Sequence, residues 1–203
     1  MTDRAKELDA AAKDIDLESL QAAKSAVATS CQEYVRWAEL FSRRLDGVDP
    51  GELHKFARAF SLTLLGHLPT RPETCPFCIQ YGHDKSCQGC GYATTHGRCD
   101  AEDSAFSLFI EAFQELGRSV YLDTGEFCCS PYDARMHLNL TIKATRDVAM
   151  RLQEDLPSAG AKRLMELKAA YLDTMVWFIP VLLLSEEVRE RSLLVRRMLL
   201  NYW

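Results

Sequence analysis

The stretch Leu17–Leu45, LESLQAAKSAVATSCQEYVRWAELFSRRL, decides the class of fold. Its apolar residues recur at alternating intervals of three and four positions, and only Lys24 breaks the stripe. The stripe consists of Leu17, Leu20, Val27, Cys31, Tyr34, Ala38, Phe41 and Leu45. This spacing is typical of a long helix that packs along its length against other helices. It predicts an all-α, multi-helix bundle in which Cys31 is a buried core residue and not a ligand.

The rest of the chain predicts further helices. We expect them over residues 49–66, 100–117, 130–156 and 161–202, where apolar residues again follow a helical period. The first three segments begin with Asp or Ser residues that can cap a helix, and the first two end at a glycine. Proline cannot continue the hydrogen bonding of a helix interior, so Pro180 should kink the last segment or divide it in two.

The helices are expected to be divided into a bundle and an insertion. Residues 1–16 lack an apolar stripe, which predicts a flexible N-terminal tail. The bundle would occupy residues 17–203 and would be interrupted at residues 66–130 by a cysteine-rich metal-binding module, which holds seven of the eight cysteines. Alternating residues around Asp123-Thr124-Gly125 predict a small β-hairpin in this module. The hairpin would carry the two cysteines that follow it back toward the others.

Five cysteines lie within residues 75–99, CPFCIQYGHDKSCQGCGYATTHGRC, with the spacing C-x2-C-x8-C-x2-C-x8-C. Each C-x2-C pair lets a tight turn direct two sulfur atoms to one centre, which is what a tetrahedral zinc site needs. We therefore predict a structural zinc ion, held in the simplest case by Cys75, Cys78, Cys87 and Cys90. Cys99 belongs to the same set of metal candidates. The possible substitutes are His83, His96, Cys128 and Cys129.

Two other uses of the cysteines stay open. Cysteine thiolates also hold iron–sulfur clusters, and seven thiols between residues 75 and 129 exceed what one zinc ion requires. Alternatively, Cys129 precedes the predicted helix at Ser130, where a helix N-terminus would stabilise its thiolate, and Cys128 or Cys99 could resolve its oxidised form. Either use would make the protein a redox protein.

Composition excludes several other classes of function. The net charge is −5 and the basic residues are scattered among acids, which argues against a nucleic-acid partner. The longest apolar run, residues 175–184, contains a proline and is about half of the roughly 20 residues that a membrane span needs. The N-terminal residues lack the apolar core of a signal peptide. We expect a cytoplasmic protein, whose reduced thiols favour metal or redox chemistry over disulfides.

These features favour a non-catalytic accessory or adaptor protein, in which a zinc module gives a fixed shape to a surface that binds another protein or a second copy through helical faces. The chain contains no phosphate-binding loop, no H-E-x-x-H and no G-x-S-x-G, so no catalytic or organic cofactor residues are assigned. The apolar C-terminal residues 198–203 could fill a partner's groove or dock on their own bundle. The alternatives are an electron-transfer subunit or redox sensor, and a metallohydrolase with an open zinc position.

Overall fold

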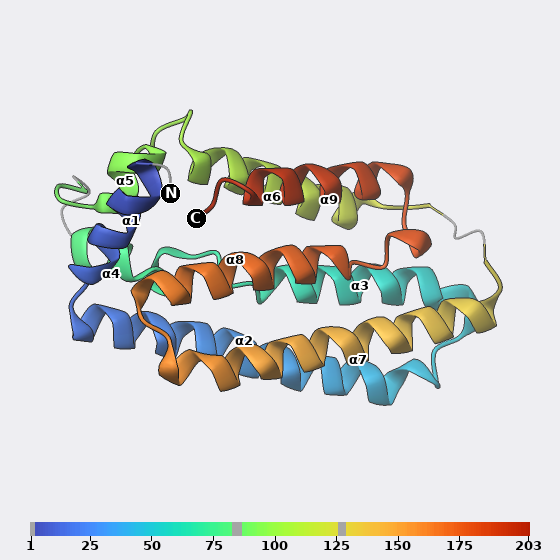
Figure 1. The fold of residues 1–203 in the computed structure, drawn as a ribbon. Helices are drawn as coiled ribbons and strands as arrows, with labels where there is room; N and C mark the ends of the chain where they lie inside the picture. Colours follow the sequence, from blue (N-terminus) through green and yellow to red (C-terminus); the bar gives the residue numbers. More distant parts are fainter. Residues whose placement is uncertain (1–2, 83–86, 126–128) are drawn as a thin grey trace.

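The computed structural model describes residues 3–82, 87–125 and 129–203 (Figure 1). Within these ranges the protein is all-helical, and none of their residues forms a β-strand. The helices of the bundle are α2 (Leu17–Leu45), α3 (Leu53–Gly66), α6 (Ala105–Leu122), α7 (Pro131–Asp155), α8 (Ala161–Trp177) and α9 (Glu186–Leu199). The predicted all-α bundle is therefore confirmed. In the described part of the chain, no helix is both long enough and apolar enough to cross a bilayer.

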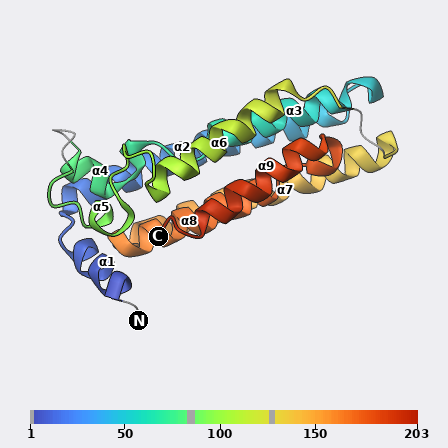
Figure 2. The same cartoon turned by 90° about the horizontal axis from the view of Figure 1, so that it is seen from above.

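The bundle helices form three stacked layers of two (Figure 1). In that view α6 and α9 form the upper layer, α3 and α8 the middle one, and α2 and α7 the lower one. Seen from above, α2, α3 and α6 make one side of the bundle and α7, α8 and α9 make the other (Figure 2). The apolar stripes of all these helices therefore share one core that runs along the bundle.

The longest helix, α2, has the bounds that its apolar stripe predicts. Asp16 caps it, because the Ser19 N–H donates to the Asp16 carboxylate at 2.6 Å. Cys31 is completely buried in the core, as predicted, and burial raises the pKa of its thiol to about 12. Helix α2 packs along α7, where the Tyr34 hydroxyl donates to Thr145 Oγ1 at 2.7 Å.

Other predicted helix ends are also observed. Ser130 caps α7, since its hydroxyl oxygen accepts the Asp133 N–H at 3.1 Å. Asp49 precedes a short 3₁₀ helix, Pro50–Glu52, that leads into α3. Pro180 lies between α8 and α9, so the last segment is divided in two, because proline removes a backbone donor that a continuous helix needs.

A helix is present where residues 100–117 predict one, but its predicted bounds and the predicted hairpin are wrong. Ser104 caps this helix by accepting the Ser107 N–H at 3.0 Å, so α6 begins after the acidic residues 100–103. It continues through Gly117 as far as Leu122, where a hairpin strand was expected. A glycine inside a helix costs about 1 kcal/mol, which burial of the apolar face of α6 outweighs. The rest of the predicted hairpin includes residues 126–128, which lie outside the described residues.

The C-terminal end of α6 is held by a buried carboxylate. Asp123 accepts a 2.6 Å hydrogen bond from His54 Nε2 on α3 and a 2.9 Å bond from the N–H of Ser185, which precedes α9. Arg58 donates to the Asp123 carbonyl oxygen at 2.9 Å. Sequence spacing could not reveal this pair, because the two residues are 69 positions apart in the chain. These bonds join three bundle helices at one end.

Residues 66–130 are not an insertion between bundle helices, because they include α6, which packs against α3 and α9. The cysteine-rich part is smaller than predicted. It contains a 3₁₀ helix, Pro72–Thr74, and the short helices α4 (Pro76–Tyr81) and α5 (Gly91–His96). These elements lie at one end of the bundle, close to the C-terminus (Figure 1). Contacts of α4 and the 3₁₀ helix with α2 attach them to it.

The N-terminal residues 3–13 form a helix, α1 (Asp3–Lys13), where a flexible tail was expected. It contacts α5 and α8, and its Leu8 is buried in the core. Gly91 allows the close approach of α1 and α5, since a Cβ atom at this position would lie only 1.9 Å from the Cβ of Ala11. Leu8 and two alanines of α1, together with one glycine in the partner helix, thus dock α1, and these small residues are too few to form a visible stripe.

Candidate functional site

The first C-x2-C pair is formed by the start of α4. Cys75 occupies the N-cap position, Pro76 is the first helical residue, and Cys78 lies in the first turn. Proline suits that place because its fixed φ matches the helix and its missing N–H would have had no intrahelical acceptor. The turn brings the Cys75 and Cys78 side chains into hydrogen-bonding contact. Both side chains are half-buried.

The second pair is formed by a left-handed turn. Cys87 has a φ of 52° and Gly89 a φ of 80°, and the Cys90 N–H closes the turn on the Cys87 carbonyl oxygen at 3.1 Å. A positive φ at Cys87 is uncommon for a residue with a side chain. Cys90 then caps α5, with the Ala93 N–H donating to its sulfur at 3.5 Å. Such an N–H···S bond favours the charged thiolate over the neutral thiol.

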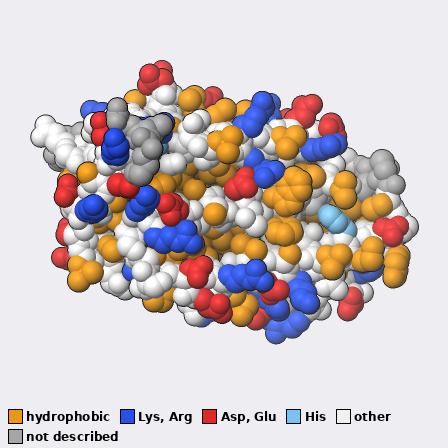
Figure 3. Space-filling model, in the orientation of Figure 1, with side chains coloured by type: hydrophobic (Ala, Val, Ile, Leu, Met, Phe, Trp, Pro, Cys, Tyr) orange, Lys and Arg blue, Asp and Glu red, His pale blue; other side chains and the backbone are white. Residues whose placement is uncertain are grey.

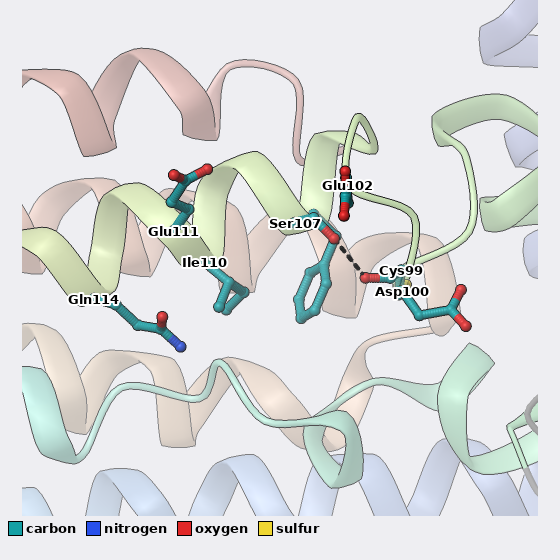
Figure 4. A pocket seen from close by; sticks show the side chains of 8 residues that line it. Cys99, Asp100, Glu102, Ser107, Ile110, Glu111 and Gln114 are labelled. Atoms are coloured by element: carbon teal, nitrogen blue, oxygen red, sulfur yellow. Dashed lines mark hydrogen bonds between the residues drawn. The ribbon is translucent and has the colours of Figure 1, made fainter.

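Cys99 joins the first pair from the loop between α5 and α6. Its side chain makes a hydrogen-bonding contact with Cys78. The loop is attached to α6 by the Ser107 hydroxyl, which donates to the Cys99 carbonyl oxygen at 2.8 Å (Figure 4). Cys90 is close enough to Cys75 and Cys78 to interact with them electrostatically. The structure therefore gathers cysteines from three separate segments at one end of the bundle.

The surroundings of Cys75, Cys78 and Cys90 raise the pKa values of these three thiols. The pKa of Cys75 is raised well above its usual value, first by its hydrogen bond with Cys78 and then by burial. The pKa of Cys78 reaches about 12, because the effects of Cys99 and burial outweigh the opposing effect of the bond with Cys75. Burial also raises the pKa of Cys90. A cation among the sulfurs would reverse this balance, since it stabilises thiolates directly.

A cavity of about 10 Å³ lies beside Cys75, Cys78 and Cys99. Tyr92 and Tyr202 are among the residues that enclose it. Such a volume holds about one water-sized particle. The cavity therefore has the scale of a single ion or water molecule.

A more open pocket lies on the other side of Cys99 (Figure 4). Its volume is about 470 Å³, and it includes the carboxylates of Asp100, Glu102 and Glu111. Arg98 pairs with Asp100 at 2.7 Å, so this carboxylate already has a cationic partner. Cys99 lines both the small cavity and the open pocket.

Lys168 of α8 is the unexpected member of the site. Only 1% of this residue is exposed, and its ammonium group donates to Thr74 O at 2.7 Å and to Thr74 Oγ1 at 3.0 Å. No ion pair joins it to a carboxylate anywhere in residues 3–82, 87–125 or 129–203. Burial lowers the pKa of Lys168, whereas the neighbouring Cys75 and Cys78 act to raise it. A signal was present in the sequence, because Lys168 interrupts the apolar stripe of α8.

The pairwise contacts do not form a complete ligand shell. Within the part of the chain that the structure describes, no three or more Cys, His, Asp or Glu side chains form a group that could hold a metal ion. Cys75 contacts Cys78 and Cys78 contacts Cys99, so the sulfurs meet in pairs and do not surround a common point. The predicted metal therefore remains a proposal.

Of the four substitute ligands, the structure describes His96 and Cys129. His96 is buried and stacks on Tyr92 with 4.1 Å between ring centroids, and its Nε2 has no hydrogen-bond partner among the described residues. Cys129 follows the far end of α6, whose 18 residues span about 27 Å. The expected return of Cys129 toward the other cysteines is therefore wrong. His83 and Cys128 lie outside the described residues.

The C-terminal residues cover the cluster. Tyr202 is only 2% exposed, and the Tyr92 hydroxyl donates to its carbonyl oxygen at 2.9 Å. The ring of Trp203 lies 5.8 Å from that of Phe77, between centroids. Of the two expectations for the apolar tail, docking on its own bundle is the one observed. Leu200 nevertheless remains 80% exposed.

Fold and site together define an all-helical protein with a cluster of cysteines and one buried lysine at the end of its bundle. No protein-family model, curated protein or solved structure matches this chain.

Proposed function

We propose that the protein is a non-catalytic accessory or adaptor protein whose cysteine cluster binds one structural zinc ion. The observation that carries the proposal is that thiols from three chain segments meet beside the buried ammonium group of Lys168. The four expected ligands are Cys75, Cys78, Cys90 and Cys99, whose thiols interact with one another in pairs. Cys87, in the turn before Cys90, is the fifth candidate.

The charges of the site support zinc. A zinc ion with four thiolates carries a net charge of about −2, which is costly to bury without a compensating cation. Lys168 supplies a positive charge beside Cys75 and Cys78, and no carboxylate of the described residues neutralises it. A buried ammonium group without an anionic partner would itself be destabilising, so a thiolate–zinc centre would resolve both charge problems together.

The position of the cluster supports a structural role for the metal. The short helices α4 and α5 have six residues each, which is too few for helices to be stable alone. A metal ion that joins the two would provide the free energy that their small apolar surface does not. The surface built from α4, α5 and the C-terminus would then keep one shape for a protein partner in the cytoplasm.

Elemental analysis and a visible spectrum of protein purified without oxygen test the proposal. We expect about one zinc ion per chain and no colour, because zinc has a filled d shell. Cys75→Ser and Cys99→Ser should lose the zinc, whereas Cys129→Ser at the far end of α6 should keep it. Absence of zinc from anaerobically purified wild-type protein would reject the proposal.

The alternative function is that of an iron–sulfur or thiol redox subunit. The observation that favours it is a fifth cysteine, Cys87, whose thiol is close enough to that of Cys90 to interact with it electrostatically. The same experiment distinguishes it, because iron and a visible absorption band that bleaches on reduction would replace zinc. A reactive-thiol sensor is disfavoured at Cys78, since a thiol with a pKa of about 12 is hardly ionised at neutral pH.

A zinc hydrolase is the other alternative. It needs three protein ligands and a water molecule in an open fourth position. Tyr92 and Tyr202 enclose the small cavity beside the sulfurs, which favours a closed site. Four thiolate ligands in the zinc-loaded protein, measured by X-ray absorption, would exclude the hydrolase.

A further inference from the structure

A second feature lies away from the cysteine cluster, on the face of the bundle formed by α7, α8 and α9. A groove of about 650 Å³ runs between α7 and α9, and the end of α8 and the connection to α9 contribute to it. Apolar side chains make up much of its lining: Leu140, Ala144, Trp177, Phe178, Ile179, Val181, Leu182 and Leu193. The face in Figure 3 carries hydrophobic side chains over the region where α8 and α9 lie in Figure 1.

Several of these side chains are more exposed than a bundle surface requires. Leu182 is 71% exposed, Leu140 is 63% exposed and Trp177 is 62% exposed. Single exposed apolar residues are ordinary, but several that line one hollow mark a surface that binds something. The cost of leaving them in water would be recovered if a partner covered them.

The charges of the groove indicate which kind of partner it fits. Its ionisable lining residues are His137, Arg189 and Arg196, and no Asp or Glu lines it. Arg196 is held by two hydrogen bonds to Asp173, at 2.8 and 3.1 Å, and lies 4.6 Å from the centre of the Trp177 ring. The charged side chains of the lining are therefore Arg189 and Arg196, and each already pairs with a carboxylate that does not line the groove.

Arg189 is the arginine that can change partners. It pairs with Glu186 at 3.4 Å, and both side chains are more than half exposed. Exposed pairs of this kind contribute little, so a carboxylate held in the groove could compete for Arg189. A carboxylate that approached beside apolar contacts would be shielded from water and would be bound more strongly.

We propose that this groove binds an acidic amphipathic helix of a partner protein, with its apolar side chains between α7 and α9 and a carboxylate on Arg189. The proposal deepens the adaptor part of the proposed function, because it assigns the surface and the chemistry of the partner. Two parallel walls made of helices suit a helical ligand, whose apolar residues at positions i, i+3, i+4 and i+7 face one side. The chain's own apolar C-terminus does not supply the occupant, since Tyr202 is buried beside the cysteine cluster.

The test selects ligands from a displayed library of random 18-residue peptides. The immobilised protein is the 203-residue chain, and its zinc content is measured beforehand. We expect the enriched peptides to show apolar residues at helical spacing together with Asp or Glu. Leu193→Glu should weaken their binding by about tenfold or more, because it places a charge among the apolar contacts. Leu17→Glu, at an 80% exposed leucine outside the groove, is the matched control and should not change the affinity.

A charge exchange tests the role of Arg189. Arg189→Glu should weaken the binding of an acidic peptide, and replacement of the peptide's carboxylate by arginine should restore it. Enrichment of basic peptides, no enrichment above the bare matrix, or affinities that Leu193→Glu leaves unchanged would each overturn the proposal. Self-association that Leu193→Glu abolishes would also overturn it, since it would assign the groove to a second copy.

These outcomes separate this inference from the proposed function. If peptides bind elsewhere on a zinc-containing protein, the adaptor role is supported and the groove is rejected as the binding site. Peptides that bind the groove of a protein without zinc would keep this inference and reject the structural zinc.

Discussion

At the scale of single residues, two buried ionisable side chains give the cysteine-rich end its chemistry. Lys168 places an ammonium group next to Cys75 and Cys78, and its bonds to Thr74 hold it there. His96 is enclosed by its own helix and the Tyr92 ring. In both cases burial opposes the charged form, so the charge of each side chain depends on the charges of its neighbours.

Replacement of Lys168 by methionine removes its positive charge and keeps a long apolar side chain at this position. Lys168→Met should weaken zinc binding by about 10- to 100-fold, the range found for residues that support metal ligands. Competition with a chelator of known affinity measures the effect, and Lys143→Met, at an exposed position of α7, is the control. Equal affinities in wild type and Lys168→Met, with zinc present in both, would show that the lysine only fills space.

His96 predicts a loss of stability in acid. Burial, assisted by the positive charge of Arg4, lowers the pKa of His96 to about 4 from an ordinary value of 6.5. The unfolded chain therefore binds a proton more readily, and stability falls as the pH drops from about 6.5 to 4. Between pH 7 and pH 5 the loss should be about 2 kcal/mol in the free energy of unfolding.

Urea unfolding at pH 7 and pH 5 measures this loss. His96→Phe keeps an aromatic ring on Tyr92 and removes the titrating group, so its loss of stability over the same range should be smaller than in the wild type. Any zinc released at pH 5 affects both proteins. An identical pH dependence in the two would rule out His96 as the cause.

At the scale of elements, the contrast between two glycines shows how neighbours decide what a residue does. Gly117 lies inside α6, and a Cβ atom there would meet nothing within 4 Å. Gly91 begins α5, where a Cβ atom would lie 1.9 Å from that of Ala11 on α1. The first glycine only weakens its helix, whereas the second is required for two helices to dock.

Alanine at these two positions should therefore have opposite effects. Gly91→Ala forces α1 away from α5 and should destabilise the protein by about 1–3 kcal/mol. Gly117→Ala should stabilise it by up to about 1 kcal/mol, because alanine is the better helix former. Thermal unfolding gives both values. If Gly91→Ala were as stable as the wild type, the close packing of α1 on α5 would be refuted.

At the scale of the whole molecule, the long helices should stay folded without the cysteine cluster, whereas the cluster is attached to their end. Helix α2 packs against α7, and α6 packs against α9, through apolar contacts along the bundle. The elements from Pro72 to Cys99, together with the last residues of the chain, lie at one end of it (Figure 1). Loss of the cluster should consequently loosen that end and leave the layers intact.

Cys75→Ser tests this division. Hydrogen exchange should become faster in residues 72–99 and in α1, while helices α2, α6, α7 and α9 keep their protection. Far-UV circular dichroism should change little, because most helical residues lie in the bundle. Cys129→Ser should show no such change. Global loss of helix in Cys75→Ser would mean that the cluster belongs to the main core.

Much of the fold could be predicted from local signals. The stripe of α2, the Ser130 cap of α7 and the break at Pro180 each act within a few residues, so the sequence displays them directly. The extent of α6 could not be read in this way, because its passage through Gly117 depends on burial against α3 and α9. The docking of α1 likewise depends on Ala11 meeting Gly91, 80 positions later in the chain.

By itself, the sequence determined the helical class, the bounds of α2 and α7, and the turns that bring the cysteines of each C-x2-C pair together, because these follow from periodicity and from short-range geometry. Only the tertiary structure decided that Cys99 joins the first pair, that Cys129 lies beyond the far end of α6, and that Lys168 enters the cluster. It also placed the apolar groove, with Arg189 and Arg196 in its lining, between α7 and α9. These are relations between segments distant in the chain, and they arise when the helices bury their apolar faces against one another.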